Sequence, residues 1–247
     1  MNYKISIITV CYNAENEIER TIQSVIDQTF HDYEYIIVDG ASKDSTMDIV
    51  NKYSDRIHQI VSEPDSGIYD AMNKGTKIAN GEWMIFMNAG DLFADNRVLE
   101  NVFAISYPTT IQCLYSDIYM PDSKGNWSVC PMFFENGGLN HQSTIYRREL
   151  HNEFGLYVVT KKLIISDYLF FVRLRNDQVK KIDTIIAYYK GGGVSSNGNW
   201  TRQQSLCADV AYGKRTIWGM LIIYIARQLG DYFPTQIKRR VKKILSK

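Results

Sequence analysis

Short apolar runs alternate with segments of helical spacing through residues 1–90, and this alternation limits the fold more than any other feature of the chain. The apolar runs have the β-branched and aromatic composition of buried strands: Lys4–Val10, Tyr35–Val38, Ile57–Val61 and Glu82–Met87. The segments between them have helical spacing or helix signals: Glu15–Gln28, Ser45–Tyr53 and Ile68–Ala79. The pattern predicts an α/β fold with a doubly wound, mostly parallel sheet.

The second half of the chain has a different pattern. It predicts strands at Ile111–Met120, Trp127–Met132 and Val179–Tyr188, a polar segment at Glu135–Ser143, a helix at Leu163–Arg175, and helices from Arg202 onward. No linker composition marks a boundary near residue 100. We therefore expect one domain of residues 1–200, made of two halves that divide near residue 100, and a helical extension of residues 201–247.

Charge divides the chain in the same place. Residues 1–100 contain 8 Lys/Arg and 17 Asp/Glu, whereas residues 101–247 contain 20 and 10, so the two halves are expected to meet different partners. The four cysteines are scattered, which argues against a zinc site and a disulfide framework and favours a reducing compartment. The N-terminus has no signal-peptide pattern, and the longest apolar stretch, Ile217–Ala226, is too short to span a bilayer. These features predict a cytoplasmic protein, and we expect no nucleic-acid partner.

Acidic side chains follow the predicted strands. Asp39 closes the second run and Asp91 follows the fourth, while Asp65 lies just before the third predicted helix and Asp70 near its start. Ligands of open parallel sheets bind beyond the carboxyl ends of the strands. The acids therefore predict a site for a metal and a sugar nucleotide, because a divalent cation would offset repulsion between carboxylates and a diphosphate.

Several motifs resemble glycosyltransferase family 2. They are Ile7–Asn13, Val38–Thr46, Ser62–Gly75 and the run Asn88-Ala89-Gly90-Asp91, which looks like a variant of the family's Asp-x-Asp element. The resemblance continues through His141-Gln142, Ser166-Asp167-Tyr168 and Gly191–Ser195, and so covers roughly the first 200 residues. These later motifs are similar to the branch that builds bacterial exopolysaccharide and O-antigen repeat units, including the colanic-acid enzymes. The resemblance implies a GT-A fold, with a donor-binding half in residues 1–100 and an acceptor half in residues 101–200. It also implies inverting transfer from a nucleoside-diphosphate sugar.

The resemblance also implies roles for individual residues near the donor. Asp91 would bind Mn²⁺ or Mg²⁺, beside Asn88, although the family usually has more acids at this point. Asp39 and Asp65 would contact the nucleotide, and Thr9 and Asn13 could line the same pocket. Each has a structural alternative: Asp39, Asp65 and Asp91 are common turn residues, and Thr9 is an ordinary strand residue. Asp70 ranks lower, because an acid there suits a helix start.

The acceptor side has its own candidates. Asp167 matches the family's catalytic base, although an acid near the start of a helix can also be structural. His141 could contact the metal, the diphosphate or the acceptor, or have a structural role. The loop Gly191–Ser195 could close over phosphate, and Arg202 could neutralise the leaving diphosphate.

The C-terminal tail forms an amphipathic pattern without acids. Ile237, Val241, Ile244 and Leu245 have helical spacing among six basic residues, which predicts contact with an anionic membrane surface or else a solvated helix. Such contact would bring the enzyme to a lipid-diphosphate-linked saccharide acceptor on the cytoplasmic face of the inner membrane. The alternative functions are a sugar-phosphate nucleotidylyltransferase, which would want a Gly-rich basic loop after the first strand, and a non-catalytic nucleotide-sugar-binding protein. A dinucleotide dehydrogenase is disfavoured because no GxGxxG follows the first strand.

Overall fold

The computed structural model describes residues 3–122, 124–134, 139–191 and 199–228. Its main sheet has the strand order β10 (Val179–Lys181), β6 (Cys113–Tyr115), β9 (Thr144–Arg147), β4 (Trp83–Phe86), β1 (Ile5–Cys11), β2 (Tyr33–Asp39) and β3 (Gln59–Ser62). All neighbouring strands pair in parallel except β9, which is antiparallel to both β4 and β6. The α/β fold with a mostly parallel sheet, predicted from the alternation, is confirmed.

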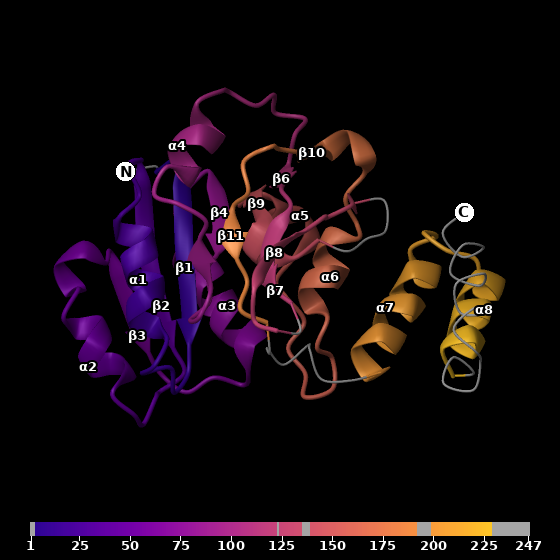
Figure 1. The fold of residues 1–247 in the computed structure, drawn as a ribbon, viewed down its shortest axis with the longest axis horizontal. Helices are drawn as coiled ribbons and strands as arrows, with labels where there is room; N and C mark the ends of the chain where they lie inside the picture. Colours follow the sequence, from indigo (N-terminus) through magenta and orange to yellow (C-terminus); the bar gives the residue numbers. More distant parts are fainter. Residues whose placement is uncertain (1–2, 123, 135–138, 192–198, 229–247) are drawn as a thin grey trace.

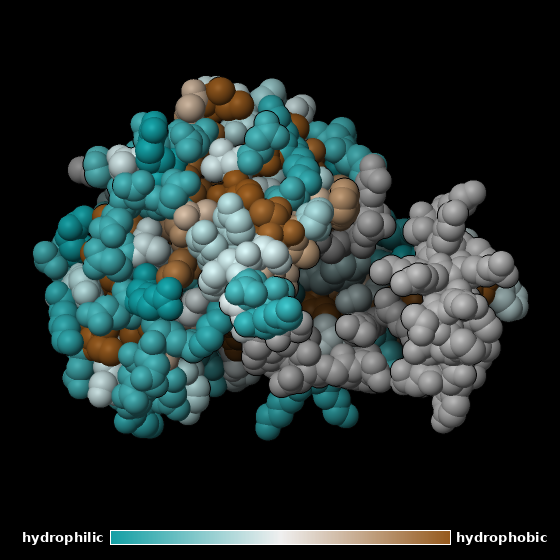
Figure 2. Space-filling model, in the orientation of Figure 1, coloured by the Kyte–Doolittle hydropathy of each residue, from teal (hydrophilic) through white to brown (hydrophobic). Residues whose placement is uncertain are grey.

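Helices cover both faces of this sheet (Figure 1). The helices are α1 (Ile18–Ile26), α2 (Thr46–Asn51), α3 (Ile68–Ile78), α4 (Val98–Phe103), α5 (Leu150–Phe154), α6 (Ser166–Phe171), α7 (Asn199–Ala211) and α8 (Ile217–Gln228). Short 3₁₀ helices lie at Ser54–Arg56, His141–Ser143 and Asn176–Gln178. Because side chains alternate along a strand, Ile5 and Ile7 of β1 join the core beneath α1, whereas Ile8 and Val10 join the core beneath α3. Hydrophilic side chains dominate the outer surface of the α1–α2 end (Figure 2).

The helix α3 lies unusually close to β1. A Cβ atom added to Gly75 would lie 2.6 Å from Cγ2 of Ile8, a fully buried residue of the central strand. The absence of a side chain at Gly75 therefore permits this close packing of helix against sheet. The close approach matters for the site, because the N-terminal end of α3 carries Tyr69, one of the cavity residues.

We expect Gly75→Ala to lower the free energy of unfolding by up to about 2 kcal/mol. Alanine would gain roughly 1 kcal/mol of helix propensity, but overpacking a core typically costs about 1–3 kcal/mol, and Ile8 is held rigid by its β-branch. Urea denaturation would measure the change, with Lys77→Ala on the exposed side of the same helix as the control. A stabilised Gly75→Ala variant would show that the helix can move away from the strand without cost.

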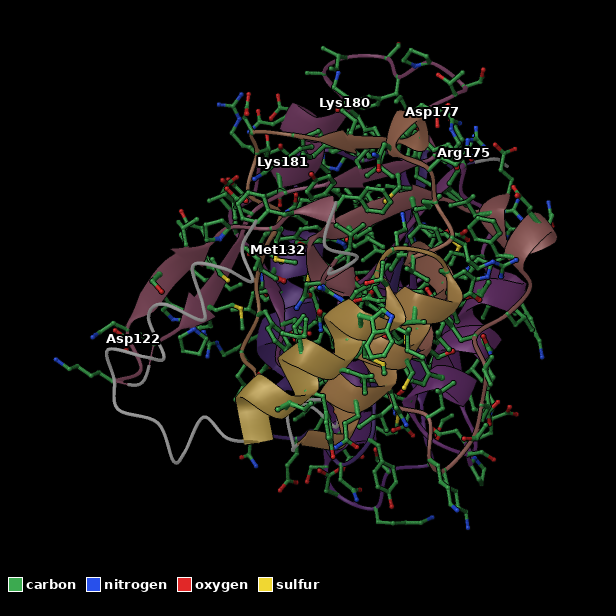
Figure 3. The ribbon with its side chains drawn as sticks, turned by 90° about the vertical axis from the view of Figure 1, so that its right-hand side faces the viewer. Asp122, Met132, Arg175, Asp177, Lys180 and Lys181 are labelled. Atoms are coloured by element: carbon green, nitrogen blue, oxygen red, sulfur yellow. The ribbon has the colours of Figure 1, made fainter. Side chains whose placement is uncertain are left out.

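A second, smaller sheet has the strand order β5 (Leu92–Phe93), β11 (Ala187–Tyr188), β7 (Ile118–Pro121) and β8 (Trp127–Cys130). The single strands predicted at Ile111–Met120 and Val179–Tyr188 are therefore wrong, because each segment supplies one strand to each sheet. Figure 3 shows the β7–β8 hairpin projecting from the body with Asp122 near its tip. Lys181 of β10 links the two sheets, with Nζ 2.6 Å from Oδ1 of Asp117 and 3.2 Å from the Met132 carbonyl oxygen.

The C-terminal helices α7 and α8 lie side by side at one end of the molecule, opposite the end formed by α2 and β3 (Figure 1). Within the described ranges, no helix has both the length and the apolar composition needed to cross a bilayer. The basic tail predicted to contact membranes begins after residue 228, so that prediction lies outside the described residues. The expected division into domains at residues 100 and 200 stays a prediction.

Candidate active site

A cavity of about 800 Å³ opens at the carboxyl ends of β1 and β4. Its walls come from the loop after β1, the start of α3, the loop after β4, the 3₁₀ helix at His141–Ser143, the segment 159–167 and the loop after β11. This is the edge of the sheet at which the sequence predicted a ligand. Of the predicted site residues, the cavity wall contains Asn13, Asp65, Asn88, Asp91, His141 and Asp167.

Four polar side chains from distant parts of the chain form one continuous row of hydrogen bonds. Nδ2 of Asn88 lies 2.9 Å from Nε2 of His141, and Nδ1 of His141 lies 2.8 Å from Oδ2 of Asp167. The other carboxylate oxygen of Asp167 accepts a 2.7 Å bond from the Tyr69 hydroxyl. The row fits a His141 tautomer that donates from Nδ1 and accepts at Nε2.

Asp167 remains ionised within this row. Burial alone would raise its pKa, but the hydrogen bond from His141, the attraction of that ring when protonated, and the bond from Tyr69 outweigh burial, so the pKa of Asp167 lies below its ordinary value. A carboxylate has about four acceptor sites, so one bond to each oxygen leaves capacity for an incoming hydroxyl. The arrangement can therefore accept a proton from a substrate bound in the cavity.

Asp91 lies deeper, beside Asn88. Its Oδ2 accepts a 2.8 Å bond from Nε2 of Gln142, and its Oδ1 lies 3.3 Å from the backbone nitrogen of Lys190. Burial raises the pKa of Asp91 to about 6, because the hydrogen bonds from Gln142 and Lys190 only partly offset the loss of solvation. Keeping this buried carboxylate ionised therefore costs free energy, and a bound cation would offset that cost.

The surroundings of Asp91 fit a hard cation. Oδ1 of Asn88 and Oε1 of Gln142 are buried and have no hydrogen-bond partner among the described residues. Buried carbonyl oxygens without partners are rare and call for a ligand. Together with Asp91 they offer the oxygen chemistry that Mg²⁺ and Mn²⁺ prefer, although the described residues contain no cluster of three His, Cys, Asp or Glu side chains suited to a metal.

The opposite end of the cavity is built from the loop after β1 and the segment before α3. Asn13 has a left-handed backbone (φ 48°), and its Oδ1 accepts a 2.8 Å bond from the backbone nitrogen of Lys43. Oδ1 of Asp65 accepts a 2.8 Å bond from the Gly67 nitrogen. Tyr12 is 62% exposed and lines the same end, so its ring is free to stack on a planar ligand.

Two predicted donor contacts are not in the cavity wall. Thr9 is fully buried, and its hydroxyl donates a 2.7 Å bond to the Met87 carbonyl oxygen between neighbouring strands, so the structure places this side chain in the interior of the sheet. Asp39 is also fully buried, with Oδ2 accepting a 2.7 Å bond from Ser62 and a 3.0 Å bond from the Ser42 nitrogen. Asp39 therefore orders the loop behind the cavity, the turn role left open by the sequence.

Other residues near the site have structural roles. Oδ2 of Asp70 accepts a 2.9 Å bond from the Ser66 nitrogen at the start of α3, in agreement with its lower ranking. Asn73 exchanges bonds of 2.8 and 2.9 Å with the backbone of Tyr157, which fixes the acceptor-side wall against α3. The side chain of Arg202 and most of the predicted loop Gly191–Ser195 lie outside the described residues.

Sequence reasoning missed Tyr12, Tyr69, Gln142 and Lys190 as cavity residues. The first three lie within quoted motifs, and Gln142 directly follows His141, so proximity to a predicted residue was a usable signal. Lys190 directly precedes the quoted motif Gly191–Ser195, but its contact with Asp91 joins residues 99 positions apart, so no local pattern indicated that contact.

Comparison with known proteins identifies the chain's relatives. Residues 6–162 match the family model described as glycosyl transferase family 2. A PGL/p-HBAD biosynthesis glycosyltransferase of Mycobacterium tuberculosis is 29% identical over 203 residues, 78% of each chain. The Escherichia coli UDP-Glc:alpha-D-GlcNAc-diphosphoundecaprenol beta-1,3-glucosyltransferase WfgD is 28% identical over 191 residues, 74% of each chain.

Solved structures show the same fold. Residues 1–349 of Staphylococcus aureus TarS, in complex with UDP, superpose with a TM-score of 0.69 over 92% of this chain and 72% of that one, at 19% identity. The Pyrobaculum calidifontis mannosyltransferase PcManGT, in complex with GDP-Man and Mn²⁺, gives a TM-score of 0.61 over 99% and 70%, at 14% identity. The chain therefore has the GT-A fold.

Proposed function

This chain belongs to glycosyltransferase family 2, and we propose that it transfers a sugar, with inversion, from a nucleoside-diphosphate donor to a lipid-diphosphate-linked saccharide during assembly of a bacterial surface polysaccharide. The observation that carries the proposal is the meeting of Asp167, His141, Asn88 and Asp91 in one cavity at the carboxyl edge of the sheet. A non-catalytic binding protein would have no need for an ionised carboxylate oriented by both a histidine and a tyrosine.

In the proposed reaction, Asp167 takes the proton from an acceptor hydroxyl as that oxygen bonds to the anomeric carbon. The bond between the anomeric carbon and the diphosphate oxygen breaks on the opposite side, and the nucleoside diphosphate departs with the bonding electrons. His141 and Tyr69 hold the carboxylate in place through their bonds to its two oxygens.

The donor would lie with its base toward Tyr12, Asn13 and Asp65 and its diphosphate toward Asn88 and Asp91. Asp91, with the unpartnered oxygens of Asn88 and Gln142, would hold Mn²⁺ or Mg²⁺. When bound, such an ion supplies positive charge that stabilises the departing diphosphate. Lys190, whose backbone contacts Asp91, and Arg202 could add further positive charge.

The acceptor would enter along the wall formed by residues 159–167, which brings its hydroxyl to Asp167. A lipid-diphosphate-linked acceptor is supported by the relative WfgD, whose name specifies a GlcNAc-diphosphoundecaprenol substrate. A protein with this acceptor would work at the cytoplasmic face of the inner membrane, where the basic tail of residues 237–247 could bind anionic lipid.

Incubation with UDP-glucose, UDP-GlcNAc or GDP-mannose tests the proposal, with Mn²⁺ and a short-chain lipid-diphosphate GlcNAc as acceptor. We expect release of nucleoside diphosphate that depends on the acceptor, together with a lipid product longer by one sugar and opposite to the donor in anomeric configuration. A nucleotidylyltransferase would instead form or consume pyrophosphate, and a pure binding protein would release no nucleotide. Either result, across all three donors, would overturn the proposal.

A further inference from the structure

The outward face of α8 is apolar along its length. Within the part of α8 whose side chains are described, the exposed residues are Ile217, Trp218, Leu221, Ile222, Tyr224 and Ile225, and Trp218 is 73% exposed. At 3.6 residues per turn, these positions share one side of the helix, and the buried Ile223 lies on the other. Figure 3, which looks onto this end of the molecule, shows α8 across the front of the view.

Such a face is the reverse of an ordinary surface helix, in which polar residues face water. Contiguous exposed apolar patches usually mark an interaction surface. The length of α8 limits the possibilities, because its twelve described residues span only about 18 Å at 1.5 Å per residue, against a hydrocarbon core of about 30 Å. The helix is therefore suited to lying in a membrane interface rather than crossing the bilayer.

The charge around α8 indicates which surface would cover it. From Lys214 to Lys247 the sequence contains nine Lys or Arg and a single acid, Asp231. Lys214 is exposed immediately before the helix. Aliphatic side chains with Trp and Tyr, flanked by cations, match the apolar layer and the anionic headgroups of a bacterial membrane.

Hydrogen bonds connect the α7–α8 pair to the cavity, so a membrane surface that covered α8 would lie close to the active site. Gln204 of the adjacent helix α7 bonds to the backbone of Lys162 and Ile164, with distances of 2.6 and 3.2 Å. Tyr168 of α6, next to Asp167, donates a hydrogen bond to Asp209 of α7. The helix pair is therefore joined to the wall of the cavity along which the acceptor would enter.

We propose that α8 is an interfacial membrane helix that inserts Trp218, Ile222 and their apolar neighbours into an anionic leaflet. This inference rests on the proposed function for its purpose, because a lipid-linked acceptor must be met at a bilayer. The contact itself can be measured without donor or acceptor, so failure of the lipid contact and failure of the transfer reaction are separate results.

Co-sedimentation of the full chain with vesicles tests the proposal, using phosphatidylglycerol and phosphatidylcholine in about equal amounts. We expect the double variant Trp218→Ser/Ile222→Ser to bind at least ~10-fold more weakly than wild type, since two large apolar side chains would no longer insert. Both residues are exposed, so the variant should keep its fold and its activity on a water-soluble acceptor. Ile105→Ser/Val129→Ser, which removes two exposed apolar side chains away from α8, is the matched control and should bind normally.

Tryptophan fluorescence gives an independent reading. Wild type should show a blue shift with these vesicles and quenching by lipids brominated near the headgroup, and Trp218→Phe should lose most of both signals. Unchanged vesicle binding by the double variant would overturn the proposal. It would also be overturned if wild type were a dimer that ignores vesicles and the double variant a monomer, because the face would then bind a second copy.

Discussion

Asp167→Asn should lower the turnover number at least ~10²-fold while leaving donor affinity nearly unchanged. Asparagine keeps the size of the side chain but cannot take a proton from the acceptor hydroxyl. Its oxygen can still accept from His141 or Tyr69, so the cavity should keep its shape. Donor affinity should be retained, because the proposed donor contacts are Tyr12, Asn13, Asp65, Asn88 and Asp91, and Asp167 is not among them.

Steady-state transfer and calorimetric titration of the donor would measure the two quantities separately. Asp177→Asn is the matched control, since this exposed aspartate pairs only with Arg175 outside the cavity. Near-normal turnover of Asp167→Asn would refute the assignment of Asp167 as the base. Asp167 would then be a structural acid near the start of α6.

The pH profile distinguishes a base from a structural acid. Because the pKa of Asp167 is lowered, wild type should lose activity only as the pH falls through that low value. Tyr69→Phe removes a hydrogen bond that favours the ionised form, so the acid limb of the turnover profile should move to higher pH. A purely structural loss would lower activity without moving that limb.

The fold of residues 1–100 was largely predictable from sequence because its signals are local. Each strand from β1 to β4 is a short apolar run beside a helix with its own periodicity, so each element can be identified from its own residues. The motif residues Asn88 and Asp91 lie directly after β4, and the position of that strand in the sheet brings them to the predicted edge.

The fold after residue 100 was less predictable because its contacts are long-range. The strand β9, which joins β4 to β6, follows a polar segment and gives no strong period of its own. The position of Thr9 could not be predicted from local sequence for the same reason. Only the register of β1 against its neighbours places the Thr9 hydroxyl in the interior rather than in the cavity. Pairing and register are set by the whole fold, and a motif read alone does not contain them.

Asp91→Asn should abolish metal-dependent donor binding and yet stabilise the metal-free protein at neutral pH. Asparagine replaces the one charged oxygen ligand among the proposed metal contacts, which leaves only neutral amide oxygens near the ion. The same change removes a buried charge. If the Gln142 amide turned over, its oxygen could accept a bond from the new amide, and the number of buried polar atoms without a partner would not rise.

The sign of the pH effect follows from the raised pKa of Asp91. The folded state binds the proton more tightly than the unfolded state, so this group's contribution to stability falls as the pH rises from about 4 to about 6. The shift from 3.8 to about 6 corresponds to roughly 3 kcal/mol above pH 7 in the metal-free protein. Asparagine cannot ionise, so the variant should lose this fall and be more stable than wild type at pH 7 in the presence of a chelator.

Urea denaturation at pH 5 and pH 7 with a chelator would test the stability claim, and thermal stabilisation by UDP-glucose with Mn²⁺ would test the binding claim. Asp48→Asn, on the exposed side of α2, is the control and should match wild type in both. If Asp91→Asn kept full transfer activity and full stabilisation by donor with metal, Asp91 would not hold the cation. Loss of binding together with loss of metal-free stability would instead mean that the carboxylate is needed for folding, because a site built for a cation should be relieved by neutralising it.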